Sequence, residues 1–368
     1  MNEPAPRFFL HGNEAWAAML AACAQARESI DIEQYIFADD EIGRQFVEVL
    51  RERAWAGVKI RILCDTVGSW SLYTSQLPTV MKQDGIEVRF FNIVSPWRID
   101  NFFSWFFRDH RKIMIVDKKI GFTGGIGIQN KMYDWRDTCV EVRGSIVNEM
   151  IFTFNEMWLQ VANRDLLSRI QKARNYTRGF RFITGAPYLG KRFLYSSIID
   201  AIRSAKTYAY ITTPYFIPDQ RLARVLKLAV KRGVDVRVLL PGLPEDPDPQ
   251  FKIKTQELVR YGAYSFYEPM LRAGVRLYEY HKNFLHSKTM TIDDEWSTVG
   301  SFNLDSLSFF YNYEANIVST DQESAQTIKK HFLTDLEHST EIKMKQWIQR
   351  PLYQKFRELL VTPIRPFL

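Results

Sequence analysis

Hydrophobic and polar positions follow the same order twice along the chain. Residues 28–65 contain an alternating run, then apolar side chains at helical spacing, then a second alternating run that begins at Gly57. Residues 206–242 repeat this order, and their second alternating run begins at Gly233, 176 positions later. Alternation has the period of a strand with one buried face, and the helical spacing is that of a helix packed on a sheet. The pattern therefore predicts a strand–helix–strand unit in each half.

A third strand-like run follows in each half, beginning at Gly85 and at Gly274. Strands that alternate with helices usually pair in parallel and carry helices on both faces of the sheet. We therefore predict an α/β protein of two similar halves, each a mixed sheet flanked by helices, related by a pseudo-two-fold axis with the active site between them. The polar, basic stretch 163–181 contains the expected join, so that the halves are residues 1–165 and 166–368.

The composition is that of a folded protein, with 46% hydrophobic and 25% charged residues. The 49 Lys and Arg exceed the 42 Asp and Glu by seven, which favours an anionic partner such as nucleic acid, a lipid surface or a phosphate substrate. Cys23, Cys64 and Cys139 lie far apart, which argues against a disulfide scaffold or a structural zinc site. No apolar run reaches the roughly 18 residues of a membrane-spanning helix. We expect a soluble or peripherally attached protein of a reducing compartment.

Each half contains the pattern His-x-Lys-x4-Asp, and the two copies are again 176 positions apart. The members are His110, Lys112 and Asp117 in the first half and His286, Lys288 and Asp293 in the second. Each copy leads into a glycine turn, and the second turn also carries Ser301 and Asn303. Because the residues after each histidine alternate like a strand, His and Lys project from the same face. The six motif residues are the candidate catalytic set.

This duplicated pattern suits the cleavage of a phosphodiester. In-line attack on phosphorus needs a nucleophile and a leaving-group acid on opposite sides, and two half-sites supply both. One neutral imidazole attacks and becomes a covalent phosphohistidine, while the other, protonated, donates to the departing alkoxide. Their pKa values must therefore differ. The two lysines, the Asn303 amide and the Ser301 hydroxyl would neutralise the non-bridging oxygens, so that no metal or other cofactor is expected.

Two carboxylates are candidates to fix the imidazole tautomers. Asp137 follows His110 by 27 residues and Glu314 follows His286 by 28, each beside a strand-like run. A solvated or salt-bridged carboxylate is the alternative for both. Asp117 and Asp293 close the motifs at strand ends, where we expect them to hold backbone or lysine rather than to take part in the chemistry.

The chain resembles the phospholipase D superfamily over nearly its whole length and is most similar within it to bacterial cardiolipin synthases. The stretches that carry the resemblance are 32–46, 95–117, 122–128, 135–138, 212–220 and 284–294. The resemblance implies the two-lobed phospholipase D-like fold and metal-independent phosphohistidine chemistry. It assigns catalytic roles to both motif histidines, both motif lysines and Asn303, with His110 favoured as the nucleophile. One departure is Gly127, which stands where the second half has Asn303, so that the phosphate-binding amide is not duplicated.

Two segments are candidates for contact with a membrane. The stretch 90–107 is dense in aromatic side chains and ends three residues before His110. We interpret its densest part as an interfacial insertion, with ordinary core as the alternative. The residues concerned are Phe102, Phe103, Trp105, Phe106 and Phe107. The C-terminal stretch 343–368 mixes apolar and basic residues; it fits an amphipathic helix in the headgroup plane, or equally a helix packed on the second half.

The predicted function is a phosphatidyltransferase that makes cardiolipin from phosphatidylglycerol, attached peripherally to the cytoplasmic face of the bacterial inner membrane. A phospholipase D hydrolase would use the same residues with water as the acceptor. A nuclease of the same superfamily is less favoured, because aromatic residues rather than distributed Lys and Arg approach the site. A non-catalytic binding protein is disfavoured because both motifs are intact. The sequence leaves the donor lipid and the oligomeric state open.

Overall fold

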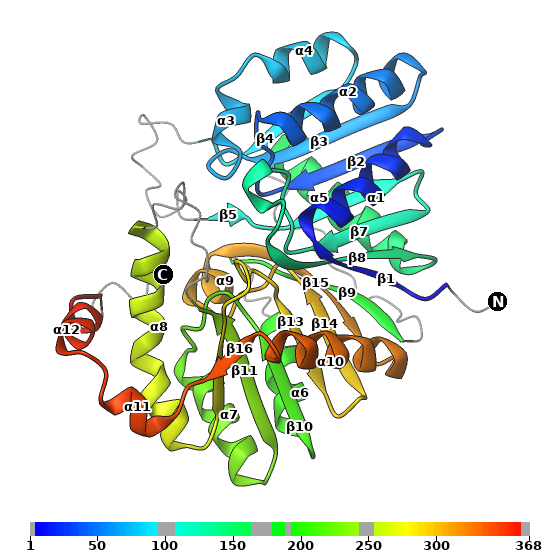
Figure 1. Cartoon of the computed structure of the whole chain (residues 1–368). Coiled ribbons are helices and arrows are strands. Elements are labelled where there is room, and N and C mark those ends of the chain that lie inside the picture. Colours follow the sequence, from blue (N-terminus) through cyan, green and yellow to red (C-terminus); the bar gives the residue numbers. More distant parts are fainter. Residues whose placement is uncertain (1–3, 94–106, 163–178, 188–192, 243–253, 362–368) are drawn as a thin grey trace. The chain divides into compact units, whose positions relative to one another are not determined.

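The computed structural model describes residues 4–93, 107–162, 179–187, 193–242 and 254–361. The chain divides into two compact units (Figure 1). Unit 1 consists of the chain up to Thr184 together with Val299–Ser301 and Asn312–Ile317, and unit 2 contains the remaining residues from Gly185 onward. The join predicted at residues 165 and 166 lies outside the described residues.

Unit 1 contains a seven-stranded mixed sheet of order β1-β8-β7-β6-β2-β3-β4. Its strands are β1 (Arg7–His11), β2 (Ser29–Gln34), β3 (Lys59–Asp65), β4 (Glu87–Phe91), β6 (Lys112–Val116), β7 (Ile120–Gly124) and β8 (Arg136–Arg143). β2, β3 and β4 pair in parallel, whereas β6 pairs antiparallel with β2. The antiparallel order then continues through β7 and β8 to β1.

Helices cover both faces of this sheet, as the alternation of strands and helices along the sequence predicts. They are α1 (Gly12–Ala24), α2 (Glu41–Trp55), α3 (Trp70–Tyr73), α4 (Leu77–Gln83) and α5 (Ile146–Ala162), with a short 3-10 turn at Asn130–Met132. Cys23 of α1 contacts Met114 of β6, on the face that also carries Ile32. On the opposite face Arg61 lies over the ring of Phe154 in α5. All of β2 is buried because both of its faces are covered.

Unit 2 repeats the central part of this arrangement. Its sheet runs in the order β16-β12-β11-β10-β13-β14. The strands are β10 (Tyr208–Thr212), β11 (Asp235–Pro241), β12 (Arg276–Tyr280), β13 (Thr289–Ile292), β14 (Trp296–Gly300, of which the last two residues belong to unit 1) and β16 (Ser339–Glu341). The order β13-β10-β11-β12 matches β6-β2-β3-β4 of unit 1, with the same parallel and antiparallel pairs. The predicted α/β architecture of two similar halves with mixed sheets is therefore confirmed.

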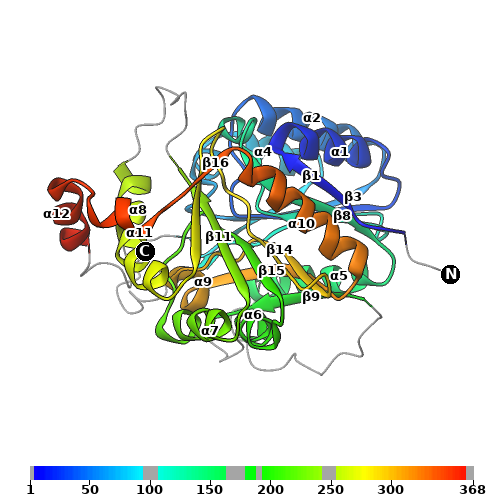
Figure 2. The same cartoon turned by 60° about the horizontal axis from the view of Figure 1, so that its bottom comes forward.

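Helices of unit 2 lie on and beside this sheet. They are α6 (Phe193–Ser204), α7 (Gln220–Lys231), α8 (Lys254–Arg272), α9 (Ser306–Phe310), α10 (Gln322–Leu336), α11 (Met344–Ile348) and α12 (Leu352–Val361). α7 packs on β11, and α10 packs on β10 and β13. α11 and α12 both contact α8 and lie beside it in both views (Figures 1 and 2). Among the helices of the described ranges, none combines the length and the apolar character needed to cross a membrane.

Three further strands, β5, β9 and β15, lie next to the first motif or pair with one another. β15 (Asn312–Ser319) pairs in parallel with β5 (Arg108–Asp109) through Asn312 and Tyr313, and all of these paired residues belong to unit 1. β9 (Phe180–Gly185) also pairs with β15. The pairing of β15 with β5 matters for the site, because β5 directly precedes the first motif histidine.

Candidate functional site

The backbone around His110 is held from two sides. The His110 amide donates to the carbonyl of Tyr313, at 2.9 Å, as a continuation of the β5–β15 pairing. On the other side Asp65, at the end of β3, accepts from the Asp109 amide at 3.0 Å and lies 3.5 Å from the Arg108 guanidinium. Burial raises the pKa of Asp65 to about 6, although Arg108 opposes the rise. The histidine thus sits on a segment with little freedom to move.

The His110 ring is paired with the carboxylate of Glu314. Both carboxylate oxygens lie 3.0 Å from Nδ1 of the imidazole, and Glu314 is completely buried. The Ser301 hydroxyl donates to Oε2 of Glu314, and the Asn312 amide donates to Oε1 at 3.3 Å. Burial by itself would raise the pKa of Glu314, but His110, Lys112 and the Ser301 hydroxyl together lower it below its ordinary value.

An ionised carboxylate at Nδ1 determines the tautomer of the ring. Because Glu314 only accepts hydrogen bonds in this state, Nδ1 of His110 carries a proton and the lone pair of the neutral ring lies on Nε2. The ring of Tyr35 contacts the imidazole edge-on, with 4.7 Å between ring centroids. Sequence reasoning did not single out Tyr35, although it lies in one of the stretches that carry the family resemblance.

Ser301 contacts the carboxylate that pairs with His110. The sequence places its hydroxyl among the groups that neutralise phosphate oxygens, but the hydroxyl donates to Glu314 and accepts from the Ala315 amide at 3.0 Å. A hydroxyl has one proton to donate, so that proton supports the carboxylate. Ser301 therefore holds Glu314 in place.

Lys112 lies next to His110 with its ammonium group turned back along the chain. Its Nζ donates to the His110 carbonyl at 2.8 Å, and the side chain is buried. Burial lowers the pKa of Lys112 to about 8, and the nearby carboxylates, Glu314 and Asp137 first among them, oppose the decrease. The charge of this lysine is therefore sensitive to pH near neutrality, and an anionic ligand beside it would favour the protonated form.

Asp137 is buried and lies close to Lys112. Its Oδ1 accepts from the Thr138 amide at 2.7 Å. A Cβ atom at Gly125 would lie 2.2 Å from the same carboxylate, so the glycine turn after the first motif is needed to admit Asp137. Of the two carboxylates that could fix an imidazole tautomer, Glu314 follows the second motif in sequence, yet it pairs with His110 of the first motif.

A buried ionic cluster next to His110 was not found by sequence reasoning. Arg111 donates through Nε to Asp109 at 3.1 Å, and its Nη2 lies 2.6 Å from Glu33 of β2. All three side chains are buried. Burial raises the pKa of Glu33 well above its ordinary value, while Arg111 opposes that rise. The only sequence signal was a glutamate inside a strand whose two faces are both expected to be covered.

The aspartates that close the two motifs have equivalent structural roles. Asp117 accepts from the amides of residues 27, 28 and 29, between 2.7 and 3.0 Å. Asp293 accepts from the amides of residues 206, 207 and 208, between 2.7 and 2.9 Å. Both have positive φ, 50° and 55°. Asp117 directly follows the last residue of β6, and Asp293 directly follows the last residue of β13. They anchor the start of β2 and β10 and belong to the framework.

The second motif reproduces the local geometry of the first within unit 2. The Lys288 ammonium donates to the carbonyl of His286, as Lys112 does to His110. Both residues are buried, and the ring of Phe284 stacks on the imidazole with 6.2 Å between centroids. The histidine–lysine arrangement is therefore repeated in atomic detail.

Asn303 occupies a turn that is fixed from both ends. Its amide donates to Ser308 Oγ at 3.2 Å, and the Asp305 side chain caps α9 by accepting from the Ser308 amide at 2.8 Å. The side chain is buried, and its Oδ1 has no hydrogen-bond partner among the residues that the structure describes. A buried amide oxygen without a partner is unfavourable and is typical of a group that meets a ligand.

The corresponding position of unit 1, Gly127, is tightly packed. A Cβ at Gly127 would lie 3.1 Å from Cβ and 3.2 Å from the carbonyl oxygen of Ile36, and the Gly127 carbonyl accepts from the indole of Trp16 at 2.9 Å. A side chain at Gly127 would thus require Ile36 to shift by a few tenths of an ångström.

One residue of the predicted aromatic insertion, Phe107, belongs to the described residues. Phe102, Phe103, Trp105 and Phe106 lie outside the described residues. Phe107 is half-buried, and its carbonyl accepts from the Asn92 side chain at 2.8 Å. Elsewhere in unit 1, Val67, Trp70 and Ile93 are exposed.

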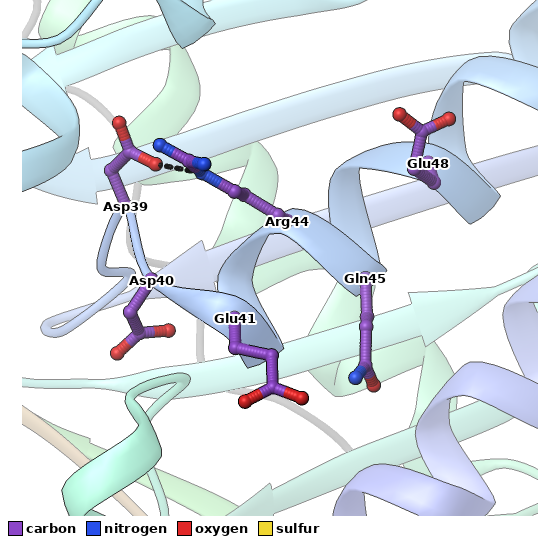
Figure 3. A pocket seen from close by; sticks show the side chains of 6 residues that line it. All are labelled: Asp39, Asp40, Glu41, Arg44, Gln45 and Glu48. Carbon is purple, nitrogen blue, oxygen red and sulfur yellow. Dashed lines mark hydrogen bonds and ion pairs between the residues drawn. The ribbon is translucent and has the colours of Figure 1, made fainter.

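A surface pocket of unit 1 is lined by residues of α2 and the loop before it (Figure 3). Four of its six lining residues are acidic, but Asp39 pairs with Arg44 at 2.7 Å, and Asp40 caps α2 through the Gly43 amide. Within the described ranges, no group of three or more His, Cys, Asp or Glu could hold a metal ion. The pocket contains no member of either motif.

The chain is similar in sequence to cardiolipin synthases along most of its length. A family model described as "Cardiolipin synthase, PLD-like domain" matches residues 19–158 and 198–336, once in each half. The cardiolipin synthase of Geobacillus kaustophilus is 32% identical over 370 residues, which cover 97% of this chain and 71% of that protein. That of Halalkalibacterium halodurans is 33% identical over 369 residues with the same coverage. The phosphatidylserine synthase structure from Haemophilus influenzae has a TM-score of 0.78 at 16% identity, covering 100% of this chain and 97% of that one, which shows a shared fold.

Proposed function

Since the chain belongs to the phospholipase D-like family of cardiolipin synthases and is a phosphatidyltransferase, we propose that it makes cardiolipin from two molecules of phosphatidylglycerol through a phosphohistidine on His110. The observation that supports His110 as the nucleophile is its contact with the buried, ionised Glu314. This contact fixes the proton on Nδ1, directs the lone pair of Nε2 outward from the carboxylate, and stabilises the positive charge that the ring acquires when Nε2 bonds to phosphorus.

In the first proposed step, Nε2 of His110 attacks the phosphorus of a donor phosphatidylglycerol. The bond from phosphorus to the headgroup glycerol breaks, and protonated His286 donates its proton to the departing oxygen. Lys112 and Lys288 stabilise the charge on the non-bridging oxygens, and the Asn303 side chain positions the substrate.

In the second step, neutral His286 accepts the proton of a hydroxyl on the acceptor phosphatidylglycerol. The hydroxyl oxygen attacks phosphorus, the phosphorus–nitrogen bond breaks, and cardiolipin is released with His110 regenerated. The products are one cardiolipin and one glycerol for two phosphatidylglycerols. If water replaces the acceptor, the same residues produce phosphatidic acid, which is the hydrolase alternative.

The test is to incubate the purified chain with phosphatidylglycerol vesicles and to identify the products by mass. We expect cardiolipin and glycerol from the wild type and from His11→Ala, a control at a histidine outside both motifs, and neither product from His110→Ala. Phosphatidic acid without cardiolipin would show that the enzyme is a hydrolase.

The nucleophile can be assigned separately. With a p-nitrophenyl phosphodiester, whose leaving group departs without an acid, His286→Ala should accumulate a phosphorylated peptide that contains His110. An adduct on His286 in the wild-type protein would reverse the two roles.

We further propose that the protein attaches peripherally to the cytoplasmic face of the bacterial inner membrane. The cardiolipin synthase family and the exposed Val67, Trp70 and Ile93 of unit 1 support a membrane-associated enzyme. Alkaline carbonate should release the protein from isolated membranes, and protease added outside intact spheroplasts should leave it uncut. Retention in the carbonate pellet would contradict peripheral attachment, and cleavage from outside would contradict the cytoplasmic face.

A further inference from the structure

Helix α12 is oriented with its apolar side away from the protein. Its exposed apolar side chains recur at helical spacing and form one surface, which we call the α12 face. They are Leu352 (80% exposed), Tyr353 (59%), Phe356 (60%), Leu359 (66%) and Leu360 (61%). Residues at positions i, i+4, i+7 and i+8 share one side of a helix, so these side chains form a continuous stripe.

The side of α12 that faces α8 is the more polar one. Glu358 pairs with Arg350 at 2.5 Å and lines a pocket together with Ser265 and Arg272 of unit 2. Arg357 donates to the hydroxyl of Tyr261 on α8 at 3.1 Å. Only Val361 of α12 is a buried apolar residue. A helix that packs on a globular protein normally does the reverse and buries its apolar stripe.

The helix pair α11–α12 also carries a concentrated positive charge. Residues 343–361 contain five Lys or Arg and one Glu, which leaves +4 of the +7 for the whole chain. Lys343, Lys345 and Arg357 are exposed, although Lys343 also pairs with Glu341. An exposed apolar stripe bordered by cationic side chains is the pattern of a helix that lies in a phospholipid headgroup region.

We propose that the α12 face docks on the interface of an anionic phospholipid membrane while α12 stays packed on α8. The apolar side chains enter the boundary between headgroups and acyl chains, and the lysines and arginine contact lipid phosphates. Each basic residue near an anionic surface strengthens binding about fivefold. The proposal deepens the proposed function, because phosphatidylglycerol would be both the substrate and the anionic surface.

A second copy of the chain is a poorer occupant of the α12 face. Stable protein interfaces use roughly 20–30 residues on each side. The α12 face offers five apolar residues, and the α11–α12 pair carries like charges that would repel an identical pair. A membrane interface requires no such area and attracts the charge.

The experiment measures the binding of the whole chain to vesicles by flotation. The vesicles consist of phosphatidylcholine alone or of phosphatidylcholine with about 30% phosphatidylglycerol. The α12 variant is Leu352→Ser, Phe356→Ser and Leu359→Ser. Its matched control removes one Phe and two Leu that are exposed on other helices of unit 2, Phe193→Ser, Leu228→Ser and Leu333→Ser. We expect the α12 variant to bind anionic vesicles at least about tenfold more weakly than the wild type, and the control to bind like the wild type.

A charge variant and a size measurement complete the test. Lys343→Gln, Lys345→Gln and Arg357→Gln should weaken binding to phosphatidylglycerol vesicles about 100-fold and leave binding to pure phosphatidylcholine unchanged. Equal vesicle binding by the wild type and the α12 variant would overturn the proposal. So would a dimer in solution that the α12 variant converts to a monomer, because the face would then be a contact between copies.

These outcomes are independent of the proposed chemistry. Vesicle binding is measured without turnover, so a protein that binds through α12 but makes no cardiolipin would refute the proposed function alone. Conversely, an α12 variant that keeps full activity on a short-chain, monomeric phosphatidylglycerol shows that the fold and the catalytic groups are intact. Circular dichroism of each variant supplies the same control for the fold.

Discussion

Replacement of Glu314 by Gln tests whether this carboxylate positions His110 for attack. The substitution keeps the shape of the side chain but removes the charge that lies 3.0 Å from Nδ1. A hydrogen bond to a charged group contributes about 1.5–3 kcal/mol, which corresponds to about 10–150-fold in rate if it is lost as the imidazole becomes positive.

A second effect adds to the first. The Gln amide can present its NH2 group to Nδ1, which would move the ring proton to Nε2 and block attack; in serine proteases the equivalent Asp-to-Asn change lowers kcat about 10⁴-fold through the wrong tautomer. We therefore expect kcat to fall about 100- to 10,000-fold, with KM for a short-chain phosphatidylglycerol changed by less than about threefold.

The matched control is Asp31→Asn. Asp31 is a buried carboxylate of the same unit, and its side chain accepts two hydrogen bonds from Arg61, at 2.7 and 2.9 Å. Loss of the charged acceptor of these hydrogen bonds should cost about 1.5–3 kcal/mol of unfolding free energy, with kcat retained. Thermal unfolding and steady-state kinetics on both variants separate the two roles. A Glu314→Gln enzyme with kcat within threefold of the wild type would refute the role of Glu314.

Three further predictions concern pH, metal and the framework. Because burial lowers the pKa of Lys112 to about 8, kcat/KM should fall as pH rises through about 8, when Lys112 loses the charge that holds phosphate. Lys112→Arg should remove that decrease. If the pH profile of this variant is unchanged, the decrease belongs to another group. The free energy of unfolding should change in the opposite direction. Lys112 binds its proton more tightly in the unfolded chain than in the folded one, so the free energy of unfolding should rise between pH 8 and about 10.5. Activity in EDTA should equal activity without it, and a loss that Mg²⁺ or Zn²⁺ restores would contradict the metal-free mechanism. Asp117→Asn, which keeps a residue tolerant of φ 50°, should lower the unfolding free energy by about 1 kcal/mol near pH 7 and leave kcat unchanged. Because hydrogen bonds from the 27–29 amides outweigh burial and lower the pKa of Asp117, the wild-type advantage should disappear as pH falls below about 4, and denaturant titrations at several pH values would reveal it.

The sequence by itself determined the repeat, the strand–helix order and the two motifs. These features are local or periodic: alternation reports a half-covered strand, and an offset of 176 positions brings the same elements into register. The structural role expected for Asp117 and Asp293 also followed from position, because a residue that ends a strand is placed to meet the start of its neighbour.

The tertiary structure alone decided which partner each group of the site meets. Glu314 follows the second motif in sequence, yet residues 312–317 belong to unit 1, so it pairs with His110. Ser301 contacts Glu314 for the same reason, since residues 299–301 also belong to unit 1. The Glu33–Arg111 contact joins residues 78 positions apart, and no periodicity encodes such a pair.

The C-terminal helix is another element whose partners only the tertiary structure determined. The spacing of its apolar residues predicts an amphipathic helix, and the structure confirms a helix over Leu352–Val361. Periodicity does not determine which side of an amphipathic helix faces the protein, because that choice depends on what α8 presents to it. Here Tyr261 of α8 bonds to Arg357, and the pocket beside α8 is lined by Glu358. The apolar side is therefore left outward, and only the packed structure could reveal it.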